Sequence, residues 1–105
     1  MIIIGKPSDL DKLYSFPMEL IKDVSVTVSI LCEAYGYQRD IVKDLGGFCF
    51  IAEDKADVRF LLDNWKIDLV NDTAELSSEI EGYIKKLFIL SSDYCIMTYY
   101  SSDII

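Results

Sequence analysis

The chain has 105 residues, 51% of them hydrophobic, and it carries 18 acidic against 10 basic side chains with no histidine. This length fits one domain with a single core, and the net charge of -8 disfavours direct binding to nucleic acid or to an anionic membrane surface. Without histidine, Ser-His-Asp and Cys-His nucleophile systems and histidine-containing zinc sites are excluded.

The cysteines and the hydropathy of the chain indicate where it works. Cys32, Cys49 and Cys95 are far apart and odd in number, which favours reduced, buried thiols in a cytoplasm. No signal peptide is visible, and no apolar run approaches the ~20 residues that a membrane span needs. We therefore expect a cytoplasmic protein, outside the membrane, that forms one globular domain over residues 1–105.

The first elements are short. Ile2–Ile4 is a run of β-branched residues that ends at Gly5, so it predicts a first strand. Ser8 is the expected cap of a brief helix after it. Pro17 ends that helix, because a proline disfavours the helical conformation in the residue before it.

Residues 17–35 are open to two interpretations. From Val24 to Cys32, β-branched residues alternate with others in nearly a strand pattern. The same segment has apolar residues at spacings of three and four, which form a helical stripe. Pro17 suits the first helical position, and Gly36 suits the position after the last. We choose a helix over about 17–35, because a strand leaves residues 18–21 unexplained.

The middle of the chain contains a second strand and helix. Gly46 and Gly47 introduce a mostly apolar run, residues 48–52, which predicts a buried central strand. Asp54 is the expected cap of a helix that ends near Trp65. Residues 67–81 are acidic and are expected to be irregular, with a helical turn at most at 74–78. The predicted buried face of the helix consists of Val58, Leu61, Leu62 and Trp65.

The C-terminal third predicts a hairpin. Leu87–Leu90 and Tyr94–Tyr100 flank the polar residues Ser91–Asp93. In a regular strand, Tyr100 and Tyr99 fall on opposite faces, and one face is expected to lie outside the core or under a partner. The order of elements predicts an α+β fold with an about four-stranded, mostly antiparallel sheet, a C-terminal hairpin and two to three helices packed against it.

Three segments, Ile30–Asp40, Asp44–Phe48 and Leu87–Tyr94, resemble small uncharacterised proteins of low-GC Gram-positive bacteria and their prophages. No activity is known for these proteins. The resemblance implies a helix before Gly36, a strand after Gly47 and an origin in a mobile element.

The charge points to a protein partner. Residues 53–81 hold nine acidic and three basic side chains, a net charge of -6. We therefore expect a non-enzymatic protein-binding module, with an inhibitor or immunity-type role in a phage or other mobile element, and with a basic protein as its partner. A homodimer through the hairpin face or a strand edge is a further expectation. The candidate partner-binding residues are Tyr35, Tyr37, Arg39, Asp57, Asp63 and Asp68.

Plainer explanations and other functions stay open. The Tyr35–Asp40 segment also suits the end of a helix and the connection after it. We expect no catalytic residue, metal ligand or cofactor. The alternatives are a carboxylate-based metal-dependent enzyme or metal-binding domain, which uses residues 53–75, and an acidic DNA mimic, in which the acids of 53–81 stand in for phosphates.

Overall fold

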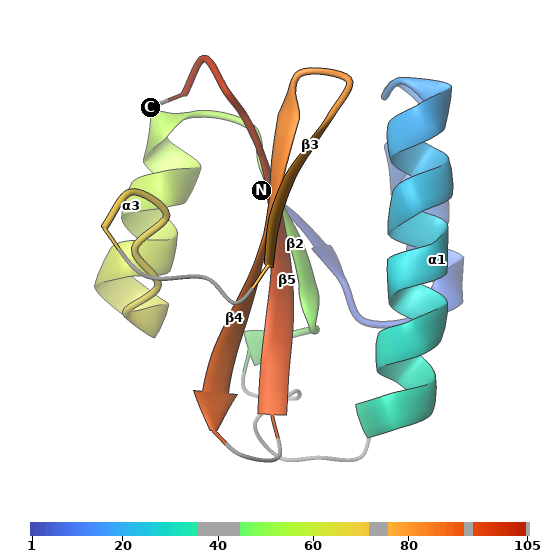
Figure 1. Cartoon of the computed structure of the whole chain (residues 1–105), viewed down its shortest axis with the longest axis horizontal. Coiled ribbons are helices and arrows are strands. Elements are labelled where there is room, and N and C mark those ends of the chain that lie inside the picture. The colour runs from blue at the N-terminus through green and yellow to red at the C-terminus, as the bar shows by residue number, and fades with distance from the viewer. Residues whose placement is uncertain (36–44, 72–75, 92–93, 105) are drawn as a thin grey trace.

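The computed structural model describes residues 1–35, 45–71, 76–91 and 94–104. Their strands form one five-stranded sheet in the order β1-β2-β5-β4-β3 (Figure 1). β2 and β5 are parallel, and the other neighbouring strands are antiparallel. The predicted α+β class and the C-terminal hairpin are confirmed. The strands are β1 (Ile2–Ile4), β2 (Cys49–Ala52), β3 (Leu76–Ile80), β4 (Tyr83–Ser91) and β5 (Tyr94–Ser101).

Helices lie on both faces of this sheet (Figure 1). The 3-10 helix η1 (Pro7–Leu13) and the helix α1 (Met18–Tyr35) lie on one side, and α3 (Lys55–Trp65) lies on the other. The prediction that one face of the last strand lies outside the core is wrong, because Tyr99 and Tyr100 are both buried. β5 is the middle strand, so α1 covers its Tyr99 side and the chain after α3 covers its Tyr100 side.

The ambiguous segment 17–35 is a helix, as predicted. Its β-branched residues do not make a strand, because the spacings of three and four give the helix a continuous apolar stripe against the sheet. Val26 and Ile30 lie outside that stripe and are each 59% exposed. The buried residues of the stripe are Leu20, Val24, Thr27, Val28 and Leu31.

The short helix η1 begins differently from the prediction. Lys6, not Ser8, occupies the N-terminal cap position. The carboxylate of Asp9 reaches back and accepts the main-chain N–H groups of Gly5, at 2.9 Å, and of Lys6, at 3.2 Å. Partial burial opposes ionisation, but these hydrogen bonds and the charge of Lys12 lower the pKa of Asp9.

The predicted strand after Gly47 is confirmed, and all of β2 is buried. Gly47 is required at its entrance, since a Cβ there would lie 2.6 Å from the carbonyl oxygen of Ile4. The main chain of Phe48 uses this closeness: its N–H donates to the oxygen of Ile4, and its own oxygen accepts from Met97.

The cap and the end of the helix α3 are as predicted, but one residue of its predicted buried face is exposed. Asp54 caps it by accepting the N–H of Asp57 at 3.0 Å, and it ends at Trp65. Leu61 is buried, but Leu62 is 37% exposed, so its assignment to the buried face is wrong. The helix meets the sheet along a narrow stripe, and Leu62 lies beyond the edge of that stripe.

The acidic segment 67–81 is less irregular than expected, because Leu76–Ile80 forms β3. Residues 76–78 are strand, so the helical turn predicted at 74–78 is wrong there, and 74–75 lie outside the described residues. β3 exists because Glu81 and Gly82, both with positive φ, form a two-residue turn that returns the chain onto β4. No described helix combines the length and hydropathy needed to cross a membrane.

Candidate functional site

The acidic residues predicted to bind a partner make local contacts. Asp57 lies in the first turn of α3, and Asp63 forms an exposed ion pair with Arg59 at 3.8 Å. Asp68 follows α3, where its carboxylate accepts the N–H groups of Val70 and Asn71, each at 3.0 Å. These interactions stabilise a helix and a turn, so none of them requires a partner.

The predicted contacts around the end of α1 are not placed. Tyr35 is the last residue of α1. Tyr37 and Arg39 lie outside the described residues. Their role in binding stays a prediction.

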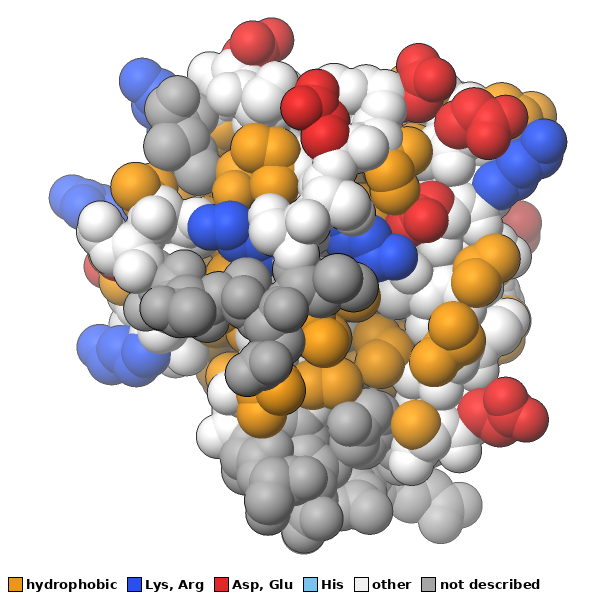
Figure 2. Space-filling view, viewed as in Figure 1, with side chains coloured by type: hydrophobic (Ala, Val, Ile, Leu, Met, Phe, Trp, Pro, Cys, Tyr) orange, Lys and Arg blue, Asp and Glu red, His pale blue; other side chains and the backbone are white. Residues whose placement is uncertain are grey.

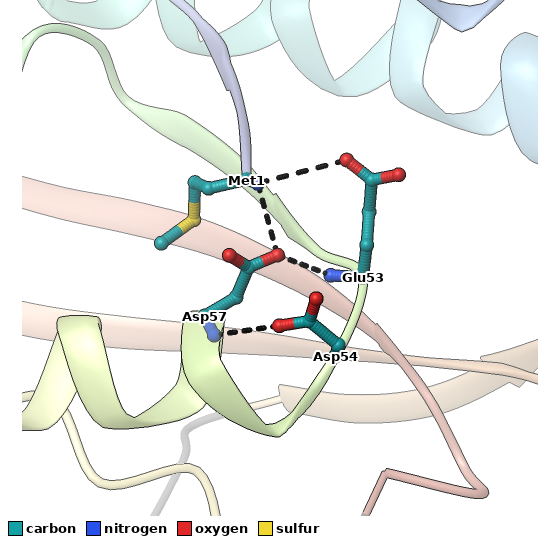
Figure 3. A network of polar contacts seen from close by, with 4 residues as sticks. All are labelled: Met1, Glu53, Asp54 and Asp57. Atoms are coloured by element: carbon teal, nitrogen blue, oxygen red, sulfur yellow. Dashed lines mark hydrogen bonds and ion pairs between the residues drawn. The ribbon is translucent and has the colours of Figure 1, made fainter.

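Asp57 belongs to a polar network at the N-terminus (Figure 3). The amino group of Met1 lies 3.0 Å from Oδ2 of Asp57 and 3.6 Å from Oε1 of Glu53. The same Oδ2 accepts the N–H of Glu53 at 2.7 Å. Burial alone lowers the pKa of the Met1 amino group, but the hydrogen bond and charge of Asp57, with Glu53, raise it overall. The network therefore joins β1 to the start of α3.

The carboxylates of residues 53–81 are the basis of the metal-binding and DNA-mimic alternatives. Within the described part of the chain, no three Cys, Asp or Glu side chains are grouped so that they could hold a metal ion. The described acids of 53–81 are distributed over α3 and its cap, the turn after it, β3 and the β3–β4 turn. A DNA mimic needs acids in a row at the spacing of phosphates, and that role stays a prediction for these residues.

A different feature, a groove between α1 and the sheet, has the form of a binding site. One hollow of about 350 Å³ lies between the C-terminal half of α1 and strands β4 and β5. Figure 2 shows hydrophobic side chains between the sheet and α1. The residues that line this hollow are Thr27, Ile30, Leu31, Ala34, Lys85, Leu87, Cys95 and Met97.

A second hollow, of about 380 Å³, lies about two turns earlier along α1. It is bounded on the sheet side by Ile80, at the end of β3. Its remaining lining residues, all on α1, are Glu19, Lys22, Asp23 and Val26. We call the two hollows together the α1 groove. Val26 and Ile30, one helical turn apart, are its exposed apolar residues on the helix side.

A polar network closes the base of the α1 groove. The hydroxyl of Tyr99 lies 2.7 Å from Oγ1 of Thr27 and donates to Oδ2 of Asp23 at 2.6 Å. Nζ of Lys85 lies 3.0 Å from the same carboxylate oxygen and 5.8 Å from the centre of the Tyr99 ring. Burial and the hydrogen bond to Asp23 raise the pKa of Tyr99 far above its ordinary value of 10.0, so its hydroxyl stays a donor.

Beneath this network, Cys49 is completely buried. Burial raises the pKa of its thiol far above the ordinary value of 9.0. Because the thiolate is the reactive form of cysteine, this group is unsuited to nucleophilic chemistry. The base of the groove therefore offers fixed, mutually satisfied polar groups under an apolar opening, which suits binding better than reaction.

The sequence contains a signal for this groove in the pattern of apolar residues along α1. The alternation from Val24 to Cys32 indicates that α1 has apolar residues on two sides. One side is the buried stripe, and the other contains Val26 and Ile30. A helix with a second apolar side exposes part of it unless something covers it, so the alternation predicts a surface site once the helix is known.

Comparison of the chain with protein-family models, with curated proteins and with solved structures gives no match.

Proposed function

We propose that this chain is a non-enzymatic protein-binding module and that its binding surface is the α1 groove. The observation that carries the proposal is the exposure of Val26 and Ile30 beside an apolar hollow of about 350 Å³. Contiguous exposed apolar surface on a small protein commonly marks an interaction site. Full burial of a valine or isoleucine side chain is worth about 1.5–3 kcal/mol, so a partner that covers both gains substantially.

The two walls of the groove are held together by hydrogen bonds and an ion pair, and this preorganisation favours binding. Asp23 and Thr27 of α1 are joined to Tyr99 of the central strand, and Lys85 of β4 pairs with Asp23. A partner that binds there does not have to order the two walls first, so less of its binding energy is lost.

The class of partner follows from charge. The net charge of -8 attracts a basic protein and accelerates its encounter. Together with the resemblance to prophage proteins, it supports an inhibitor or immunity-type role in a mobile element. The odd number of cysteines, three in the chain, supports a cytoplasmic location.

The experiment compares three forms of the protein as bait in an extract of the native host. Ile30→Asp places a charge in the groove at a position that is 59% exposed. Val70→Asp makes the same kind of change after α3, on the other side of the sheet, at a position that is 55% exposed. The proposal predicts a protein that the wild type and Val70→Asp retain and Ile30→Asp loses. Identical retention by all three forms would contradict it.

A further inference from the structure

One edge of the sheet runs beside the α1 groove. β3 is the last strand in the sheet order, and within the described residues it pairs only with β4. Ser77, Ser78 and Glu79 are exposed. In Figure 1 this strand lies at the front of the sheet, between α1 and α3. Apart from Glu79, β3 carries no charge, and it contains no proline, so little in its sequence prevents another strand from pairing with it.

The turn determines which main-chain groups of β3 are free. Ile80 and Tyr83 flank the two-residue turn, and in such hairpins the flanking residues exchange main-chain hydrogen bonds with each other. Residues that alternate with them point their N–H and C=O groups away from the partner strand. Because the β3–β4 register has no bulge, these residues are Ser77 and Glu79. Their main-chain groups therefore face the open edge.

The same alternation assigns the side chains to two faces. Ser78 lies opposite Lys85 on the α1 side, where Ile80 also lines the groove. Ser77 lies opposite Lys86 on the α3 side, where Lys86 donates to the main-chain oxygen of Leu69. Glu79 shares that side. A strand added beside β3 would thus turn alternate side chains toward the apolar groove and the others toward Glu79.

Charge at this edge is acidic and uncompensated. Glu79 in β3 and Glu81 in the turn are exposed, and neither has an ion pair in the part of the chain that the structure describes. In contrast, the acid and base that flank the groove on the α1 side, Asp23 and Lys85, neutralise each other. Basic side chains on the α3 side of an added strand would complement the edge.

We infer that the partner of this module contributes an extended segment, with apolar residues alternating with polar or basic ones, that pairs with β3 as a sixth strand of the sheet. This inference rests on the proposed function, because the apolar side chains of the segment enter the α1 groove. Main-chain hydrogen bonds to Ser77 and Glu79 supply affinity, and the groove and Glu79 select the side chains.

The test begins with a displayed library of random peptides selected on the wild-type protein. The selected peptide is synthesised, and its affinity for the protein and its variants is measured by fluorescence anisotropy. Ser77→Pro removes an outward N–H and leaves the β3–β4 hydrogen bonds intact, while Ser77→Thr is the matched control, because threonine suits a strand. We expect an alternating peptide whose affinity falls at least about tenfold with Ser77→Pro and less than about twofold with Ser77→Thr.

Ile30→Asp separates this inference from the proposed function. Loss of binding with both Ile30→Asp and Ser77→Pro supports strand addition at the groove. Loss with Ile30→Asp alone overturns strand addition and leaves the groove as the binding site. Binding that Ile30→Asp does not weaken, or a library that yields no peptide, contradicts the proposed function as well.

Two further measurements cover the remaining outcomes. If Ser77→Pro does not fold, two versions of the peptide, N-methylated at odd or at even positions, are titrated into the wild type. Strand pairing predicts that one version binds and the other does not, and equal binding by both overturns it. Sedimentation of the wild type tests whether a second copy of the chain occupies the edge. A dimer that Ser77→Pro dissociates would overturn the assignment to a separate peptide partner.

Discussion

The hydroxyl of Tyr99, in the central strand, donates a 2.6 Å hydrogen bond to the carboxylate of Asp23 in α1. This contact connects the middle of the sheet to the helix that forms one wall of the α1 groove. Thr27 and Lys85 complete the network from either side. The position of α1, and with it the width of the groove, therefore depends on a few buried or partly buried polar groups as well as on apolar packing.

Replacement of Tyr99 by phenylalanine tests this dependence. Tyr99→Phe leaves the ring in place but leaves Asp23 and Thr27 without their shared partner. We expect the free energy of unfolding to fall by about 1–3 kcal/mol, measured by urea denaturation. The control is Tyr83→Phe, in a half-buried ring with an edge-on contact to Phe16, which should change stability by less than about 0.5 kcal/mol. Equal effects of the two changes would show that the network does not stabilise the position of α1.

The ion pair of Met1 with Asp57 predicts a loss of stability in mild alkali for the chain that begins at Met1. The pKa of the amino group is raised in the folded protein above its ordinary 8.0. Its contribution is therefore fully present below pH 8 and is lost as the pH rises through the raised value.

The measurement is urea denaturation of the wild type and of Asp57→Asn between about pH 7 and pH 9.5, a window that spans the ordinary pKa of an α-amino group. Asp57→Asn keeps an oxygen for the N–H of Glu53 but removes the charge. Its stability should decline less over this range than that of the wild type. Parallel declines would assign the loss to other groups, such as the buried thiol of Cys49.

The thiols should differ in reactivity. Cys49 is completely buried and its thiol pKa is raised, whereas Cys32 is half-buried on α1. In the native protein, iodoacetamide should therefore modify Cys32 much faster than Cys49, as followed by mass spectrometry of peptides. In denaturant the two rates should become similar. Modification of native Cys49 as fast as Cys32 would show that the base of the groove is open to solvent.

The close approach of β1 to the entrance of β2 predicts an intolerant glycine. In Gly47→Ala, the new Cβ would lie 2.6 Å from the carbonyl oxygen of Ile4, so the strands must separate. We expect a loss of about 1–3 kcal/mol in stability, measured by thermal or urea denaturation. Gly82→Asn is the control, since asparagine accepts the left-handed backbone at φ 82° and nothing lies within 4 Å of a Cβ there. A tolerated Gly47→Ala would mean that this contact is not tight in solution.

Local patterns were enough to predict most of the fold. The apolar run after Gly47 and the cap at Asp54 each have one strong interpretation, and both are confirmed. β3 was missed because Leu76–Ile80 is mostly polar, and its strand conformation depends on pairing with β4 across the turn at Glu81 and Gly82. Strand propensity is weak without such a neighbour.

The candidate site was harder to predict than the fold. Charge drew attention to Asp63 and Asp68, which are used in a surface ion pair and a turn. The alternation from Val24 to Cys32 indicates that α1 has a second apolar side, but the α1 groove also depends on how far α1 lies across the sheet, which is a property of tertiary packing. Val26 and Ile30, which lie outside the buried stripe of α1, are each 59% exposed.

The binding surface can be located by titrating the ¹⁵N-labelled protein with the peptide selected from the library and following the amide chemical shifts. If the α1 groove and the adjoining edge bind the partner, the largest changes will fall on Val26, Ile30 and residues 77–80. If the largest changes fall instead around Asp57 and Asp63 on α3, the groove is not the binding surface and the contacts predicted from charge are restored.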